Sequence, residues 1–243
     1  MFDAKASPND LLTSSVGTPG VKTVAILGWK TDNIEARHQD LQKVGRHGLA
    51  THPSVLSMTS KTDTTSIVNR GNFIVEKLSC GHVPEPPKNV NVDQANMDAA
   101  TGKLTGRQIA EKHASDTACA GCHRFLDPFG VAFENFDAIG RKRAMDNGMP
   151  IDTSVELNDE LGLKGKFSGA NDLLTALAAT GRTEQCFANS FASFVMPTVW
   201  TKAQSCALNK LVLHEKGEAP TMLNVAKAFL LSDTFALRSQ ASL

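Results

Sequence analysis

Apolar residues recur at helical spacing through the last third of the chain. They predict helices at 171 to about 180, about 184 to 195, 202 to about 215 and about 221 to 231. Thr105 and Gln108 fit a capping box that would begin a further helix at 106–114, followed by a turn at Ser115 and Asp116. In the last predicted helix, the side chains expected to pack inward are Leu223, Val225, Phe229 and Leu230. The C-terminal part is therefore predicted to be mainly helical.

The first half of the chain is less regular. Residues 21–29 form an apolar run that could be a strand or a buried helical turn, 34–44 are compatible with a helix, and 72–78 suit a short helix with one buried face. Three prolines within residues 84–87 favour an extended linker. We place a boundary there, between an irregular N-terminal module at 1–88 and a helical domain at 89–243. Residues 126–130 are predicted to be a loop, and 144–170 a long connection with room for a small hairpin.

Composition narrows the classes of partner. The 243 residues carry 25 basic and 25 acidic side chains and no formal net charge, which argues against a nucleic-acid partner. No stretch approaches 18 apolar residues, so no membrane span is predicted. The N-terminus lacks a basic region followed by an apolar segment, the pattern of a secretion signal.

One local motif has a specific covalent chemistry. Cys119, Cys122 and His123 form C-x-x-C-H, the attachment signature of c-type haem. The two thiols would form thioethers to the haem vinyl groups, and His123 would be an axial ligand of the iron. A bare C-x-x-C is also compatible with zinc or dithiol redox chemistry. The histidine that follows favours haem, and the chain has no second C-x-x-C or H-x₃₋₅-H to complete a zinc site.

Two segments resemble a known family. GLATHPSVLSMTSKTDTTSIVNRGNFIVEKL with PEPPKNV, and then HASDTACAGCHRFLDPFGVAFENFDAIGR, are similar to modules of the large planctomycete-type and myxobacterial cytochrome c proteins. Ile67 stands where the family usually has proline. The resemblance covers about residues 45–238. It implies one covalently bound haem c, a small cytochrome c-like helical fold and an exported protein, periplasmic or extracellular, of which this chain would be a C-terminal piece.

Export would allow disulfide bonds. A bond between Cys186 and Cys206, which correspond to a cysteine pair in some relatives, would close a loop of about 20 residues and be worth roughly 3 kcal/mol. The alternative is two independent buried thiols. In either case Cys80 would be left without a partner.

The second face of the iron decides the chemistry of a haem. Candidates for a sixth ligand are His113, Met196 and Met58, with Met145, Met149 and His82 less favoured; each could equally be a core or surface residue. Arg70, Arg141 and Arg143 are candidates for contacts to the haem propionates, or are solvated surface arginines. Glu134 and Asp137 could be acid–base groups but favour structural capping, and Asp127 before Pro128 is most simply a turn former.

Three functions are compatible with these residues. The first is one-electron transfer by an exported monohaem module, working with redox partner proteins or further domains of a larger assembly. The second is a haem enzyme of peroxidase or oxygenase type with an open distal site. The third is a surface or assembly protein whose haem mainly stabilises the fold. One haem motif, with no nucleotide-binding signature and no second metal motif, favours the first.

Overall fold

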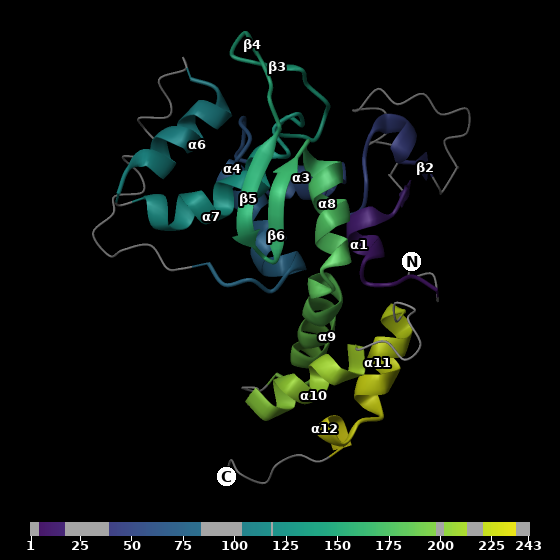
Figure 1. The fold of residues 1–243 in the computed structure, drawn as a ribbon. Helices are drawn as coiled ribbons and strands as arrows, with labels where there is room; N and C mark the ends of the chain where they lie inside the picture. The colour runs from purple at the N-terminus through teal and green to yellow at the C-terminus, as the bar shows by residue number, and fades with distance from the viewer. Residues whose placement is uncertain are drawn as a thin grey trace.

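A computed structural model describes residues 5–17, 39–83, 104–117, 119–197, 202–212 and 221–236. Helices dominate these residues and are accompanied by three two-stranded antiparallel sheets, so the prediction of a mainly helical chain is confirmed. Figure 1 shows a body built from the elements up to residue 179, from which a long helix leads down to the C-terminal helices. No helix in the described part of the chain is both long and apolar enough to span a membrane.

The N-terminal elements are short. They are α1 (Asp10–Thr13), β1 (Val16–Gly17), β2 (Gln39–Asp40), the 3-10 turn η1 (Gln42–Val44), α3 (Pro53–Met58), α4 (Ile67–Asn72) and a π-helical turn η2 (Phe73–Leu78). The helix expected at 72–78 is present, and its buried face holds Ile74, Val75 and Leu78. The helix expected at 34–44 is wrong where it can be seen, because residues 39–40 pair with β1 and Gly45 ends the 3-10 turn at φ 66°. Residues 21–29 lie outside the described residues.

Two helices flank the C-x-x-C-H motif. Helix α6 (Gly106–Ser115) begins with the predicted capping box, since Thr105 accepts from the backbone of Gln108 and the Gln108 side chain accepts from the backbone of Thr105. Helix α7 (Ala120–Val131) contains the motif's last residues and continues through Pro128. The loop predicted at 126–130 is therefore wrong.

Close packing of α7 on α4 explains why the helix continues. A Cβ atom on Gly71 would collide with the carbonyl oxygen of Leu126, and one on Gly130 would collide with the carbonyl of Ile67. Two glycines thus let the backbones of α4 and α7 meet directly. Phe129, at 0% exposure, is buried on the same helix. Tertiary packing of this kind outweighs the loss of one backbone hydrogen bond at Pro128.

The connection after α7 carries two hairpins. Strands β3 (Met145–Asp146) and β4 (Met149–Pro150) form the first, and β5 (Val155–Glu160) and β6 (Leu163–Phe167) form the second. In β5, Val155 and Leu157 point into the core while their neighbours are exposed, which is the alternation of a half-buried strand. The small hairpin that the sequence allows within residues 144–170 is confirmed.

All four predicted C-terminal helices are present. They are α8 (Ala170–Ala179), α9 (Arg182–Val195), α10 (Lys202–Val212) and α11 (Met222–Leu230), followed by the short α12 (Asp233–Ala236). Val225 and Phe229 are each 1% exposed, as expected, whereas Leu223 and Leu230 are 44% and 42% exposed and were wrongly assigned to the core. Val225 and Phe229 lie four residues apart on one face of the helix, whereas Leu223 and Leu230 lie at the sides of that face.

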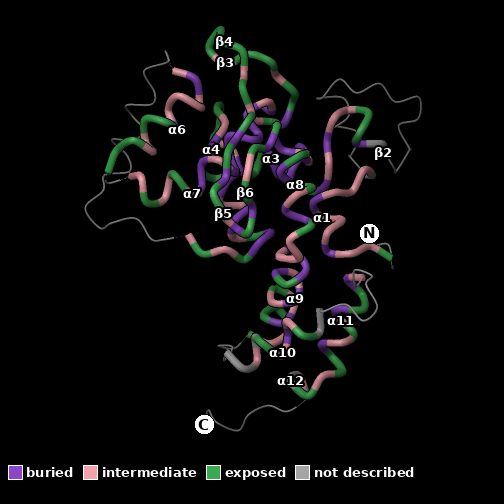
Figure 2. Tube along the Cα trace, in the orientation of Figure 1, coloured by how far each residue is buried: buried purple, intermediate pink, exposed green. Residues whose placement is uncertain are grey.

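The largest cluster of buried apolar side chains draws on elements from α1 to α8. It includes Leu56 and Ile74 from before the proline-rich segment, and Phe133 and Leu173 from after it. A smaller cluster of Ala192, Leu208 and Phe229 lies among α9, α10 and α11. Figure 2 shows the buried positions concentrated around α4, α8 and the β5–β6 hairpin, while α6 is mostly exposed or intermediate. The boundary placed at residues 84–87 lies outside the described residues.

The disulfide joins different cysteines from those expected. Cys80 is bonded to Cys186, with 5.1 Å between their Cα atoms, and Cys206 is an exposed free thiol on α10. The predicted Cys186–Cys206 bond is therefore wrong. Cys186 is buried on α9, where that helix packs against η2, and Cys80 lies two residues after the end of η2. The bond ties the segment before the proline-rich stretch to the C-terminal helices.

Candidate cofactor site at the start of helix α7

The two motif cysteines lie on the first turn of α7. Cys119 is the N-cap residue, and its carbonyl accepts from the backbone N–H of Cys122 and of His123 at 3.3 and 3.1 Å. The Asp116 carbonyl in turn accepts from the N–H of Cys119. Both thiols are half-buried and are not bonded to each other. This turn therefore places two thiols that form no disulfide and one imidazole within a single helical turn.

His123 is held by a carboxylate one turn further along. Its Nδ1 lies 3.1 and 3.0 Å from Oδ1 and Oδ2 of Asp127, a residue only 5% exposed. Burial raises the pKa of Asp127, and the hydrogen bond and charge of His123 oppose that rise. Because Asp127 lies inside α7, the prediction that it is a turn former is wrong. Nδ1 is engaged with the carboxylate, so Nε2 is the nitrogen available to a metal.

A second histidine lies beside the first. His113, in the last turn of α6, has its ring centroid 4.8 Å from that of His123, with 57° between the ring planes. Helices α6 and α7 lie side by side at one edge of the body in Figure 1, which brings the two histidines together. Of the three favoured candidates for a sixth ligand, His113 is the one whose contact with His123 is seen.

The methionine candidates lie elsewhere. Met196 ends α9 and packs against the small cluster of Leu208 and Phe229, and Met58 on α3 is 70% exposed. Met145 and Met149 are 50% and 45% exposed on the β3–β4 hairpin. His82, the remaining candidate, is also exposed.

The environment of Cys119 favours the protonated thiol. The pKa of the Cys119 thiol is raised by partial burial and by the negative charges of Asp116 and Cys122. Reactive C-x-x-C cysteines have a lowered pKa and thus a larger thiolate fraction. Within the described ranges, no group of three or more His, Cys, Asp and Glu side chains is arranged to hold a metal ion.

The Arg70 side chain is buried and bonded to groups of the protein rather than open to solvent. It is 2% exposed and donates to the carbonyl oxygens of Phe133, Phe136 and Asp137 at 2.8 to 3.0 Å. Its Nη1 also lies 3.6 Å from Oε1 of Glu134. These partners occupy the guanidinium, so the expected contact to a haem propionate is replaced by a link between α4 and the end of α7.

The other two arginines belong to the same region. Arg143 pairs with Glu134 at 2.7 Å and Asp146 at 2.9 Å, and Arg141 pairs with Asp137 at 2.9 Å. They follow the C-terminal end of a 12-residue helix whose N-terminal end holds the cysteines; such a helix is about 18 Å long. The structure thus does not bring these arginines to the motif. Glu134 is buried between arginines, which fits a structural role better than acid–base chemistry.

Asp137 forms a capping turn, as its sequence context favoured. Its Oδ1 accepts from the backbone N–H groups of Ile139 and Arg141 at 3.0 and 2.7 Å. Partial burial raises the pKa of Asp137, but the hydrogen bonds from Arg141 and Ile139 outweigh it, so the net shift is downward.

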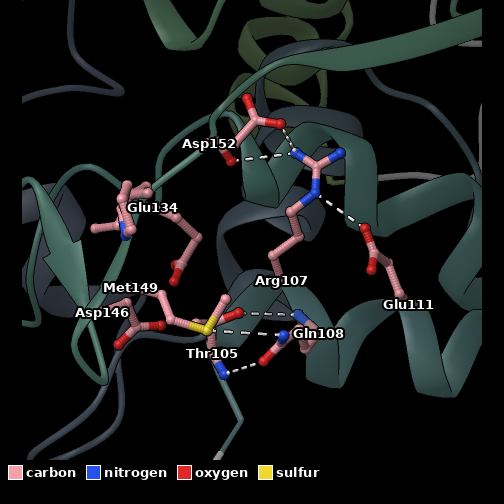
Figure 3. A pocket seen from close by; sticks show the side chains of 10 residues that line it. Thr105, Arg107, Gln108, Glu111, Glu134, Asp146, Met149 and Asp152 are labelled. Carbon is pink, nitrogen blue, oxygen red and sulfur yellow. Dashed lines mark hydrogen bonds and ion pairs between the residues drawn. The ribbon is translucent and has the colours of Figure 1, made fainter.

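A cavity of about 260 Å³ lies at the other end of α6. Figure 3 shows Arg107 between Glu111 and Asp152, with Met149 beside Gln108. Glu134 and Asp146 also line it, and both are paired with Arg143. Since these carboxylates are neutralised within the chain, the cavity is not a candidate cation site. It is also distinct from the histidine pair, which lies near the C-terminal end of α6.

Comparison with known proteins gives one result, for the segment that contains this site. Residues 46–146 match the family model PSCyt3, described as a protein of unknown function (DUF1588). The matched segment runs from before α3 to the β3–β4 hairpin and includes Cys119, Cys122 and His123. It covers less than half of the chain, and it supports the resemblance to planctomycete-type cytochrome c proteins at the level of a family. No curated protein and no solved structure matches the chain.

Proposed function

We propose that this chain is a module of an exported monohaem c-type cytochrome that transfers single electrons within a larger assembly. One observation carries the proposal: two cysteines outside any disulfide and an imidazole held through its Nδ1 lie on one helical turn. That is the donor set that covalent haem attachment needs. The Cys80–Cys186 bond supports export, because disulfides persist in oxidising compartments.

The residues of the motif fit a bound haem. Each thiol would add across one vinyl group, so that sulfur bonds to one vinyl carbon and a hydrogen goes to the other. A Cβ added at Gly121, between the cysteines, would meet no atom within 4 Å, so this face of the turn has room. His123 would supply Nε2 to the iron. When bound, the haem would provide a ferric/ferrous couple that accepts and releases one electron.

We propose His113 as the second histidine that would hold the iron. Its ring centroid lies 4.8 Å from that of His123, so both imidazoles could bind one metal ion only after the His113 ring shifts. It lies in the last turn of α6, a helix with only Ala110 buried, and such a terminus can move at little cost. Two histidine ligands would favour electron transfer over ligand binding and a lower potential than a Met ligand.

The first experiment asks whether haem is attached. The chain is produced in a bacterial periplasm together with a c-type haem maturation system, and covalent haem is measured by the pyridine haemochrome spectrum. We expect one haem per chain, lost in the Cys119→Ala/Cys122→Ala variant and retained in Cys206→Ala, which removes an exposed thiol elsewhere. Absence of covalent haem from the unaltered chain would refute the proposal.

A second experiment separates electron transfer from catalysis. We expect low-spin spectra in both oxidation states and slow binding of carbon monoxide. His113→Ala should open the iron to carbon monoxide, whereas Met196→Leu should leave the spectrum unchanged. High-spin iron in the unaltered protein that binds cyanide readily and turns over peroxide would favour the enzyme instead. Haem whose removal unfolds the chain and that exchanges electrons with no carrier would favour a purely structural role.

A further inference from the structure

The carboxylate of Asp127 has a position that the motif alone does not require. It is 5% exposed on the interior side of α7, and both its oxygens lie within hydrogen-bonding distance of Nδ1 of His123, at 3.1 and 3.0 Å. The spacing of four residues places the two side chains on the same helical face. A buried carboxylate with this geometry accepts the Nδ1 proton and keeps the ring from turning about its bond to the helix.

We propose that Asp127 is a positioning residue for His123 that fixes the Nε2 lone pair toward the haem iron and lowers the reduction potential of the haem. The inference rests on the proposed function, because it concerns the iron that His123 would bind. A carboxylate that accepts the second ring proton fixes the tautomer and makes a metal-bound imidazole a stronger donor. A stronger donor stabilises ferric iron more than ferrous iron, so the ferric/ferrous equilibrium shifts toward the oxidised state.

Other charges near the motif do not have the same relation to His123. Asp116 precedes the cysteines and is exposed, and its carbonyl oxygen accepts from the backbone N–H of Cys119. Arg124, the next residue after His123, directs Nε to the carbonyl of Ala114. The buried carboxylate on Nδ1 is therefore the group expected to set the donor strength of the imidazole, while an exposed charge such as Asp116 is screened by solvent.

The test compares Asp127→Asn with Asp116→Asn at equal haem content. Each variant removes one negative charge near the motif, but only Asp127→Asn removes the carboxylate that contacts Nδ1 of His123. We expect Asp127→Asn to shift the ferric/ferrous equilibrium at least tenfold toward ferrous iron, a rise of about 59 mV for a one-electron couple. Asp116→Asn should shift it by less than half as much on the millivolt scale. Equal shifts in the two variants would overturn the inference while leaving the haem itself in place.

A second measurement does not depend on the potential or on a variant folding. Nitrogen NMR of the unaltered full chain with labelled histidine reports which ring nitrogen of His123 carries the proton. We expect the Nδ1–H form before haem is attached. The Nε2–H form would overturn the inference whether or not the chain binds haem. Failure of haem attachment with the Nδ1–H form present would refute the proposed function alone.

Discussion

The crossing of α4 and α7 makes a quantitative prediction about the helix that carries the motif. Gly130→Ala adds a methyl group where the carbonyl of Ile67 already lies, and the obstructing atoms are backbone, which cannot rotate away. Gly121→Ala adds the same methyl group to the same helix, at a position where nothing lies within 4 Å. The pair therefore separates the effect of packing from the effect of helix propensity.

The magnitude follows from two opposing contributions. Overpacking of a close contact costs about 1–3 kcal/mol, and the gain from replacing glycine by alanine within a helix is about 0.5–1 kcal/mol. Gly130→Ala should therefore lower the free energy of unfolding by about 1–2 kcal/mol, while Gly121→Ala should raise it slightly. Because both variants share the propensity gain, they should differ by the overpacking cost alone, about 1–3 kcal/mol.

Urea unfolding followed by circular dichroism measures this difference. With a slope of about 2–3 kcal/mol/M, typical for a chain of this size, the midpoints of the two variants should lie about 1 M apart. All proteins are compared at the same haem content, since position 121 lies inside the motif. Equal midpoints would show that α7 does not contact α4 through Gly130. They would also refute the explanation that this contact lets α7 continue through Pro128.

Three further predictions concern the links around this helix. Cys186→Ser, which also leaves Cys80 without its partner, should cost about 2–5 kcal/mol by thermal unfolding, and reductant should have the same effect on the unaltered chain but none on the variant. Arg70→Met should cost about 3–5 kcal/mol by urea unfolding, because it leaves Glu134 buried without one of its cations; a loss below 1 kcal/mol would contradict a buried pair. Asp137→Asn should cost about 1 kcal/mol at pH 7. Partial burial raises the pKa of Asp137 but its hydrogen bonds lower it below the ordinary 3.8, so this stabilisation is present above pH 3.8 and is lost as the pH falls through the folded pKa.

Local signals in the sequence were enough for most of the helices. The Thr105 and Gln108 pair satisfied backbone groups at the start of α6 just as the capping box requires, and Val225 and Phe229 lie on the buried face that their spacing indicates. The partner of Cys186 could not be found in this way. Cys80 is 106 residues away, and only the packing of η2 against α9 brings the two together.

The contact between Asp127 and His123 was missed for a related reason, although a signal for it exists. The proline at 128 normally ends a helix, so the sequence placed Asp127 in a turn, where it has no fixed relation to His123. Once α7 is known to continue, the interval of four residues between histidine and aspartate is enough to predict that they meet. What allows α7 to continue is Gly130, because its missing side chain admits the backbone of α4. The motif alone thus indicates which cofactor to expect, and the residues up to Gly130 indicate how His123 is held.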